Sequence, residues 1–186
     1  MKPINAVTFS GFVLTALVLY LLGYFPFIPA WAIFITWACF FHMEGGTNKN
    51  QAFFATVLHI GLGAVAAWLS ALLVINNPFS GELVNQLWAP ILIAAVIAAL
   101  MRISSITQFS VTPAIIYGYA SIWAFLNAPD LFNPSVLLSI SFQNAIIAIS
   151  FSIILGAIAG YLNAILIEFL CKLRLPTIKK LELIIK

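Results

Sequence analysis

Residues 139–170 read SISFQNAIIAISFSIILGAIAGYLNAILIEFL, and Glu168 is the one charged residue among them. A helix needs roughly 20 mostly apolar residues to cross the hydrocarbon core of a bilayer. The stretch therefore predicts a membrane-spanning helix, and similar apolar stretches recur towards the N-terminus.

The composition of the whole chain also favours lipid as the surrounding medium. Of its 186 residues, 63% are hydrophobic and 7% are charged, whereas soluble domains carry about 25% charged residues. So few charges cannot cover a water-exposed surface, which excludes an ordinary soluble domain. We therefore expect residues 1–186 to form a single transmembrane domain.

Six apolar segments predict an all-α integral membrane protein, a bundle of six transmembrane helices. The breaks between the segments contain proline, asparagine and glycine, which favour turns. The second, fourth and fifth segments are short for a full crossing, so they either extend into flanking residues or are interrupted helices. The predicted helices cover residues 7–24, 30–42, 52–75, 87–101, 113–126 and 139–170, and residues 171–186 form a basic cytoplasmic tail.

The positions of lysine and arginine predict the orientation. With six crossings and a cytoplasmic N-terminus, all eight basic residues lie on the cytoplasmic side, where short loops are enriched in them. Glu82 and Asp130 then lie outside. Both termini are predicted to be cytoplasmic, with an amphipathic tail on the inner leaflet and Glu168 paired with a base of the tail. The basic residues are Lys2, Lys49, Arg102, Lys172, Arg174, Lys179, Lys180 and Lys186.

Six crossings also divide into two halves of three helices with opposite orientation, a 3+3 inverted repeat. The middle helix of each half opens alike, with PAWAIF at residues 29–34 and PAIIYG at residues 113–118, and each ends in a breaker. Interrupted segments at corresponding positions point to the binding region of a transporter. Proline at a helix start is also common for local reasons, so a chance match is the alternative.

The last predicted helix carries small or polar side chains at every fourth position. Small residues let helix backbones approach closely, and Gly156 and Gly160 form the usual minimal pattern. The pattern indicates either packing inside the bundle or an interface between subunits. The residues are Asn144, Ala148, Ser152, Gly156, Gly160 and Ala164.

His59 lies inside the third predicted helix, at helical spacing from Gly63, Ala66 and Ser70. An ionisable residue within a membrane is costly to bury, so it suggests a functional role such as proton or hydrogen-bond donation to a solute. The alternative is a neutral histidine that bonds to a neighbouring helix.

The connection after the second helix contains His42, Glu44, Gly45 and Gly46. Its glycines permit close backbone approach, so its amides can bind an anion and Glu44 can attract a cation or proton. An ordinary tight cytoplasmic turn explains the same residues. No third ligand accompanies the histidine and the glutamate, so a metal site is not predicted.

We expect the pathway for the solute to be completed by residues on three other segments. They are Thr36, Pro113, Tyr117 and Asn144. No enzyme motif is found, and we expect no catalytic residue, cofactor or metal. Nucleic-acid binding is not expected either, because topology already accounts for the basic residues.

Some of these features resemble a known family. The segments at 31–41, 44–46, 109–118 and 155–161 resemble the YcdZ-like bacterial inner-membrane proteins, which implies a bacterial inner-membrane location and no settled activity. Residues 31–70 are more faintly similar to the membrane part of fusaric-acid-resistance-type exporters, which implies passage of an organic anion. This chain lacks the large soluble domains of those exporters.

Together these observations predict a small-solute channel or secondary transporter, with its pathway at the interface of the two three-helix halves. We expect a homo-oligomer in the lipid bilayer that handles a small solute. The alternative is a non-transporting scaffold, accessory subunit or sensor that acts through helix packing. A polar cavity at the membrane midplane favours the first, and a dry, fully packed interior favours the second.

Overall fold

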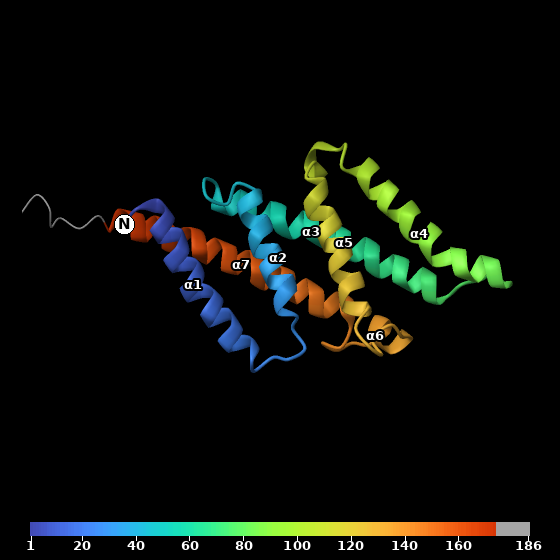
Figure 1. Ribbon diagram of the computed structural model, residues 1–186. Coiled ribbons are helices and arrows are strands. Elements are labelled where there is room, and N and C mark those ends of the chain that lie inside the picture. The colour runs from blue at the N-terminus through green and yellow to red at the C-terminus, as the bar shows by residue number, and fades with distance from the viewer. Residues whose placement is uncertain (174–186) are drawn as a thin grey trace, which may run out of the picture.

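The computed structural model describes residues 1–173, and within them the chain is all-α, as predicted (Figure 1). Four helices are long and apolar enough to cross a membrane, and two shorter apolar helices lie between them. The chain is thus a multi-pass membrane protein. The elements are α1 (Pro3–Leu22), α2 (Ala30–His42), α3 (Lys49–Ile75), α4 (Glu82–Ile103), the 3-10 helix η1 (Thr107–Phe109), α5 (Thr112–Leu126), α6 (Pro134–Leu138) and α7 (Ala145–Lys172).

Local capping explains several helix boundaries. Pro3 and Pro113 lie in the first turns of α1 and α5, where the missing N–H group has no intrahelical partner to lose. The side chain of Asn48 accepts a hydrogen bond from the backbone of Gln51, which starts α3 at Lys49. The fourth helix is longer than predicted, because it runs from Glu82 to Ile103 despite its internal Pro90.

The predicted start of the last helix at residue 139 is wrong. Asn144 caps α7 by accepting a hydrogen bond from Ile146 N, so the helix begins at Ala145. Residues 139–144 form an irregular turn after α6, a five-residue helix that the sequence did not predict. The predicted amphipathic tail and four of its basic residues, from Arg174 on, lie outside the described residues.

The two longest helices, α3 and α7, run across the molecule in opposite directions (Figure 1). The short helices α2 and α5 cross them: α5 packs most extensively against α3, and α2 against α7. Helix α1 lies against α7 and α4 lies against α3, so these two helices occupy opposite sides of the molecule. At 1.5 Å per residue, the 13 residues of α2 and the 15 of α5 extend about 20 Å and 22 Å, short of a hydrocarbon core of about 30 Å.

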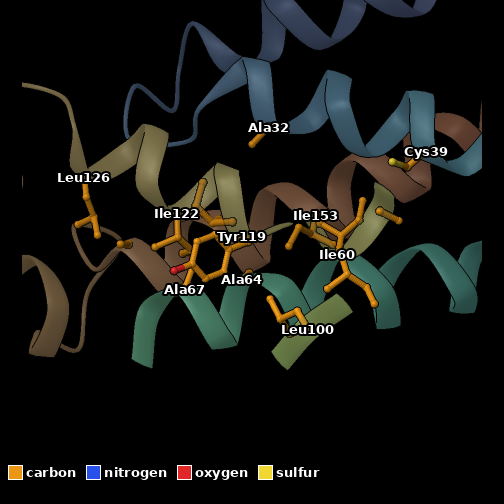
Figure 2. Close-up of a cluster of buried hydrophobic side chains, with 14 of the residues drawn as sticks. Ala32, Cys39, Ile60, Ala64, Ala67, Leu100, Tyr119, Ile122, Leu126 and Ile153 are labelled. Carbon is orange, nitrogen blue, oxygen red and sulfur yellow. The ribbon is translucent and has the colours of Figure 1, made fainter. Parts of the chain in front are cut away.

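The core lies where α3, α5 and α7 meet. Figure 2 shows Ile60 and Ala64 of α3 beside Tyr119 and Ile122 of α5 and Ile153 of α7. The outer faces of α1 and α4 instead expose large apolar side chains such as Phe12 and Ile91. This arrangement suits lipid, in which the apolar face of a helix can point outwards.

Candidate functional site

Two glycines bring α3 and α5 into backbone contact. A Cβ atom added to Gly63 would overlap the carbonyl oxygen of Ile115 and would lie 2.8 Å from Tyr119 N. A Cβ atom added to Gly118 would overlap the carbonyl oxygen of Ile60 and would lie 2.9 Å from Ile60 Cα. Each glycine therefore faces the backbone of the other helix, and no larger residue fits at either position.

A second glycine crossing joins α2 to α7. A Cβ atom on Gly156 would lie 2.5 Å from Ile33 O and 2.6 Å from Thr36 Cβ, and one on Gly160 would lie 2.7 Å from Phe40 Cβ. The small-residue pattern predicted for the last helix thus lies against another helix of the same chain. Ser152 belongs to the same helix and donates to Ala148 O at 2.8 Å. Ala164 is also buried.

His59 is buried near the start of α3, with 4% of its surface exposed. Its Nδ1 lies 2.7 Å from Ala55 O within the same helix, and its ring packs edge-on against Phe109 of η1 at a centroid distance of 6.1 Å. Its Nε2, like the hydroxyl of Thr56 one turn earlier, has no hydrogen-bond partner within residues 1–173. One imidazole nitrogen of this buried side chain is therefore left without a hydrogen bond from the described residues.

A hydrogen bond that the sequence did not predict joins α3 to α5 in the core. Ser70 Oγ and Tyr119 Oη lie 3.0 Å apart, and Ser70 also donates to Ala67 O at 2.8 Å. The serine was visible as part of the small-residue face that follows His59. The tyrosine gave no such signal, because its partner lies 49 residues away in the chain.

The loop from His42 to Asn48 is held by hydrogen bonds between its own residues. Glu44 adopts a left-handed backbone conformation with φ of 62°, and its carbonyl accepts bonds from the backbone amides of Thr47 and Asn48. A Cβ atom on Gly45 would overlap the ring of Phe40, so glycine is required there. His42, Glu44 and Gly46 are exposed.

The remaining predicted pathway residues are dispersed. Thr36 is buried and donates to Ala32 O at 2.9 Å, whereas Tyr117 is 48% exposed on the outer face of α5. Pro113 lies in the first turn of α5. Both polar atoms of the Asn144 side chain already have hydrogen-bond partners. Its Nδ2 donates to Leu137 O and Ser139 O, and its Oδ1 accepts from Ile146 N and caps α7. These residues do not form one cluster with His59.

Lys49 and Lys172 both contact Glu168, at 3.0 Å and 2.6 Å. The predicted pairing of Glu168 with a base of the tail is thus confirmed for Lys172, and Lys49 at the start of α3 is an unpredicted second partner. The N-terminal amine of Met1 donates to Leu170 O at 3.2 Å. Positive charge therefore gathers where α1, α3 and α7 meet.

The cavities described within residues 1–173 surround α7, α1 and α2. One of about 400 Å³ lies between α1, α2 and α7, and an adjoining one of about 440 Å³ reaches the Gly46 loop. Two more, of about 350 Å³ and 270 Å³, flank α7 beside α1 and α3. None of these four is lined by His59, Tyr117 or Asn144.

The sequence from residue 8 to residue 167 matches the profile of a family described as "Protein of unknown function (DUF1097)". The match covers well over half of the chain. The chain belongs to the DUF1097 family. No curated protein matches it, and no solved structure does. The resemblances to the YcdZ-like proteins and to the exporters therefore stay predictions.

The DUF1097 match includes all the glycine crossings, His59 and, apart from Val7, the residues that line the cavity between α1, α2 and α7. Within residues 1–173, no group of three or more metal-ligating side chains occurs. The chemistry that these residues offer is hydrogen bonding, together with positive charge at a lysine cluster made up of Lys49, Lys172 and the N-terminal amine, with Glu168 as its countercharge.

Proposed function

We propose that this chain is a small-solute channel or secondary transporter of the bacterial inner membrane, with a pathway at the interface of two three-helix halves. The halves are α1, α2 and α3, and α4, α5 and α7. The observation that carries the proposal is that the helix contacts keep the same pattern when the two halves are exchanged.

The main contacts follow this exchange. Packing of α5 on α3 corresponds to packing of α2 on α7, and packing of α1 on α7 corresponds to packing of α4 on α3. Each half also has a short middle helix between longer ones. Such internal symmetry around short or broken helices is a common plan of secondary transporters.

The glycine crossings support the same symmetry at the level of single residues. Gly63 of α3 faces the carbonyl of Ile115, and Gly156 of α7 faces the carbonyl of Ile33. Ile115 and Ile33 are each the fourth residue of their short helix, a register two residues away from the match between residues 29–34 and 113–118 in the sequence. In addition, an acidic residue with positive φ follows each short helix, at 62° for Glu44 and 63° for Asp130.

The tight crossings favour a transporter over an open pore. The halves touch closely at glycines, against backbone between α3 and α5 and against the side chains of Thr36 and Phe40 between α2 and α7. A solute would therefore pass only when one half moves relative to the other. His59 lies at this interface beside η1, and its free Nε2 would bind the solute or carry a proton. We further propose that both termini are cytoplasmic, as the distribution of basic residues in the sequence predicts.

Uptake by proteoliposomes tests the proposal. The purified chain is reconstituted and exposed to a mixture of bacterial metabolites, and the captured solutes are identified by mass spectrometry between pH 5 and pH 8. At least one solute should enter above the level of protein-free liposomes, and His59→Ala should reduce uptake or remove its pH dependence. His42→Ala is the matched control, because it removes the other histidine, which is exposed.

Failure of every solute to enter above the protein-free level would count against transport. Topology is tested separately with single cysteines placed at Thr47, Ser105 and Asn77. A membrane-impermeant thiol reagent added outside the cell should label only the cysteine at position 77. Labelling of position 47 or 105 from outside would contradict the proposed orientation.

A scaffold, accessory subunit or sensor is the second candidate. It is favoured by one observation, that the described cavities lie around α1 and α7 rather than along the crossing of α3 and α5. This alternative expects no uptake from wild-type chain.

A further inference from the structure

A groove between α1, α2 and α7 combines mostly apolar walls with a few polar groups. Its cavity of about 400 Å³ falls in the size range of small-molecule sites. The walls are aliphatic and aromatic, and Gly11 and Thr15 of α1 form one edge. The other lining residues are Val7, Phe34, Trp37, Ala38, Phe41, Asn163 and Ile167.

Asn163 is the polar residue of this groove whose side chain is buried without a full set of partners. It is 6% exposed, and its Oδ1 has no hydrogen-bond partner within residues 1–173. Leaving a buried amide unpaired costs about 1–3 kcal/mol. Rotation of the amide exchanges its oxygen and its nitrogen, so Asn163 can donate to or accept from a molecule in the groove. The Asn163 amide takes no part in the glycine crossings described above.

The groove opens at one end onto the lysine cluster. Its neighbouring cavity, of about 440 Å³, shares Val7, Phe41 and Ile167 with it and is lined further by Lys49 and Glu168. Lys49, Lys172 and the N-terminal amine lie at this end with Glu168 as the countercharge. Two positive charges therefore remain uncompensated by Glu168.

We propose that this groove binds one anionic phospholipid from the leaflet on the side of Met1 and Lys172. The phosphate group lies at Lys49, and the acyl chain follows the apolar walls between α1 and α2. Asn163 is five residues before Glu168 on α7, or about 7.5 Å deeper. That depth places its amide near the ester carbonyls of the lipid, which accept hydrogen bonds.

Three features distinguish a lipid from a free solute as the occupant. The walls beyond Asn163 are apolar, the charge is confined to the end at the headgroup level, and α1 leaves the groove open to the surrounding bilayer. Basic pockets between membrane helices on the cytoplasmic side are known to bind anionic headgroups. A free anion would use only the lysine end and would leave Asn163 unpaired.

Native mass spectrometry of the full chain in mild detergent tests the proposal, with phosphatidylglycerol and phosphatidylcholine as probes. Wild type should retain one phosphatidylglycerol in preference to phosphatidylcholine. Gly11→Leu should abolish this binding, because a Cβ atom at Gly11 meets no protein atom within 4 Å and the side chain enters the groove. Gly61→Leu is the matched control, since Gly61 has the same open surroundings on α3.

The charged end is tested with a second pair of variants. Lys49→Gln should weaken phosphatidylglycerol binding about fivefold, which corresponds to about 1 kcal/mol for one lysine near an anionic headgroup. Arg102→Gln removes the same charge from the exposed end of α4 and should leave the affinity unchanged. Asn163→Leu should weaken binding of phosphatidylglycerol. It should not lower the melting temperature of the protein in detergent.

Four results would each overturn the proposal. Equal losses from Lys49→Gln and Arg102→Gln would mean nonspecific lipid attraction. Binding that survives Gly11→Leu, or inorganic phosphate that displaces the lipid completely, would remove the acyl groove from the site. A dimer that is lost specifically in Gly11→Leu, without lipid binding in wild type, would assign the groove to a second copy of the chain.

Discussion

Replacement of Gly63 by alanine should be among the most destabilising single-methyl additions in this protein. The added Cβ atom would lie much closer to Ile115 O than the 3.0 Å below which Cβ atoms essentially never approach another heavy atom. Helix α5 must therefore move away from α3 by roughly an ångström. The obstacle is helical backbone, which cannot rotate aside as a side chain can. Overpacking typically costs 1–3 kcal/mol, and we expect about 3 kcal/mol here.

The matched control is Gly61→Ala, two residues away on α3. A Cβ atom at Gly61 meets no atom within 4 Å. Replacing a glycine in a helix interior by alanine stabilises the folded protein by about 0.5–1 kcal/mol. The same chemical change should therefore have opposite signs at the two positions, with a difference of at least about 3 kcal/mol.

Unfolding in detergent measures this difference. Circular dichroism during titration with sodium dodecyl sulfate gives the free energy of unfolding for each variant. Gly156→Ala and Gly160→Ala should lie between the extremes, because their nearest obstacles include the side chains of Thr36 and Phe40. Equal unfolding free energies for Gly63→Ala and Gly61→Ala would refute the argument from backbone contact. A graded series also remains informative if Gly63→Ala does not fold.

Three further predictions use the same measurement. Tyr119→Phe should cost only about 0.6 kcal/mol, typical of a hydrogen bond between membrane helices, because Ser70 keeps its bond to Ala67 O; a loss above 2 kcal/mol would be inconsistent with this. Asn144→Ala should cost about 1–2 kcal/mol through loss of the α7 cap and should increase hydrogen exchange at Ile146 N, whereas unchanged exchange would argue against the cap. Glu44→Gly should stabilise the chain by about 1 kcal/mol, because glycine adopts positive φ without steric strain; a neutral or negative effect would mean that the Glu44 side chain contributes to stability.

Helix positions followed from the sequence where the chain marks them locally. The segment at 30–42 was predicted to the residue, because Pro29 precedes it and a glycine-containing turn follows it. The segment at 139–170 was placed six residues too early, because its first residues are apolar enough to continue a helix. Hydropathy alone does not reveal that Asn144 caps the helix with its side chain.

The contacts between helices could not be predicted in the same way. Gly63 and Gly118 are ordinary small residues in the sequence, and their mutual fit depends on how α3 crosses α5. The bond between Lys49 and Glu168 spans 119 residues, and no local pattern indicates it. Asn163 lay outside the four-residue spacing of small side chains, so the groove that it lines was also missed.

The position of α1 has a consequence for how the protein is made. Its principal packing partner is α7, and Lys172 at the end of α7 follows Leu22 at the end of α1 by 150 residues. At about 5–20 residues per second, the ribosome needs roughly 8–30 s to synthesise that interval. Helix α1 must therefore wait in the bilayer for that interval before its partner helix is made, and a truncation before α7 should leave α1 open to membrane proteases.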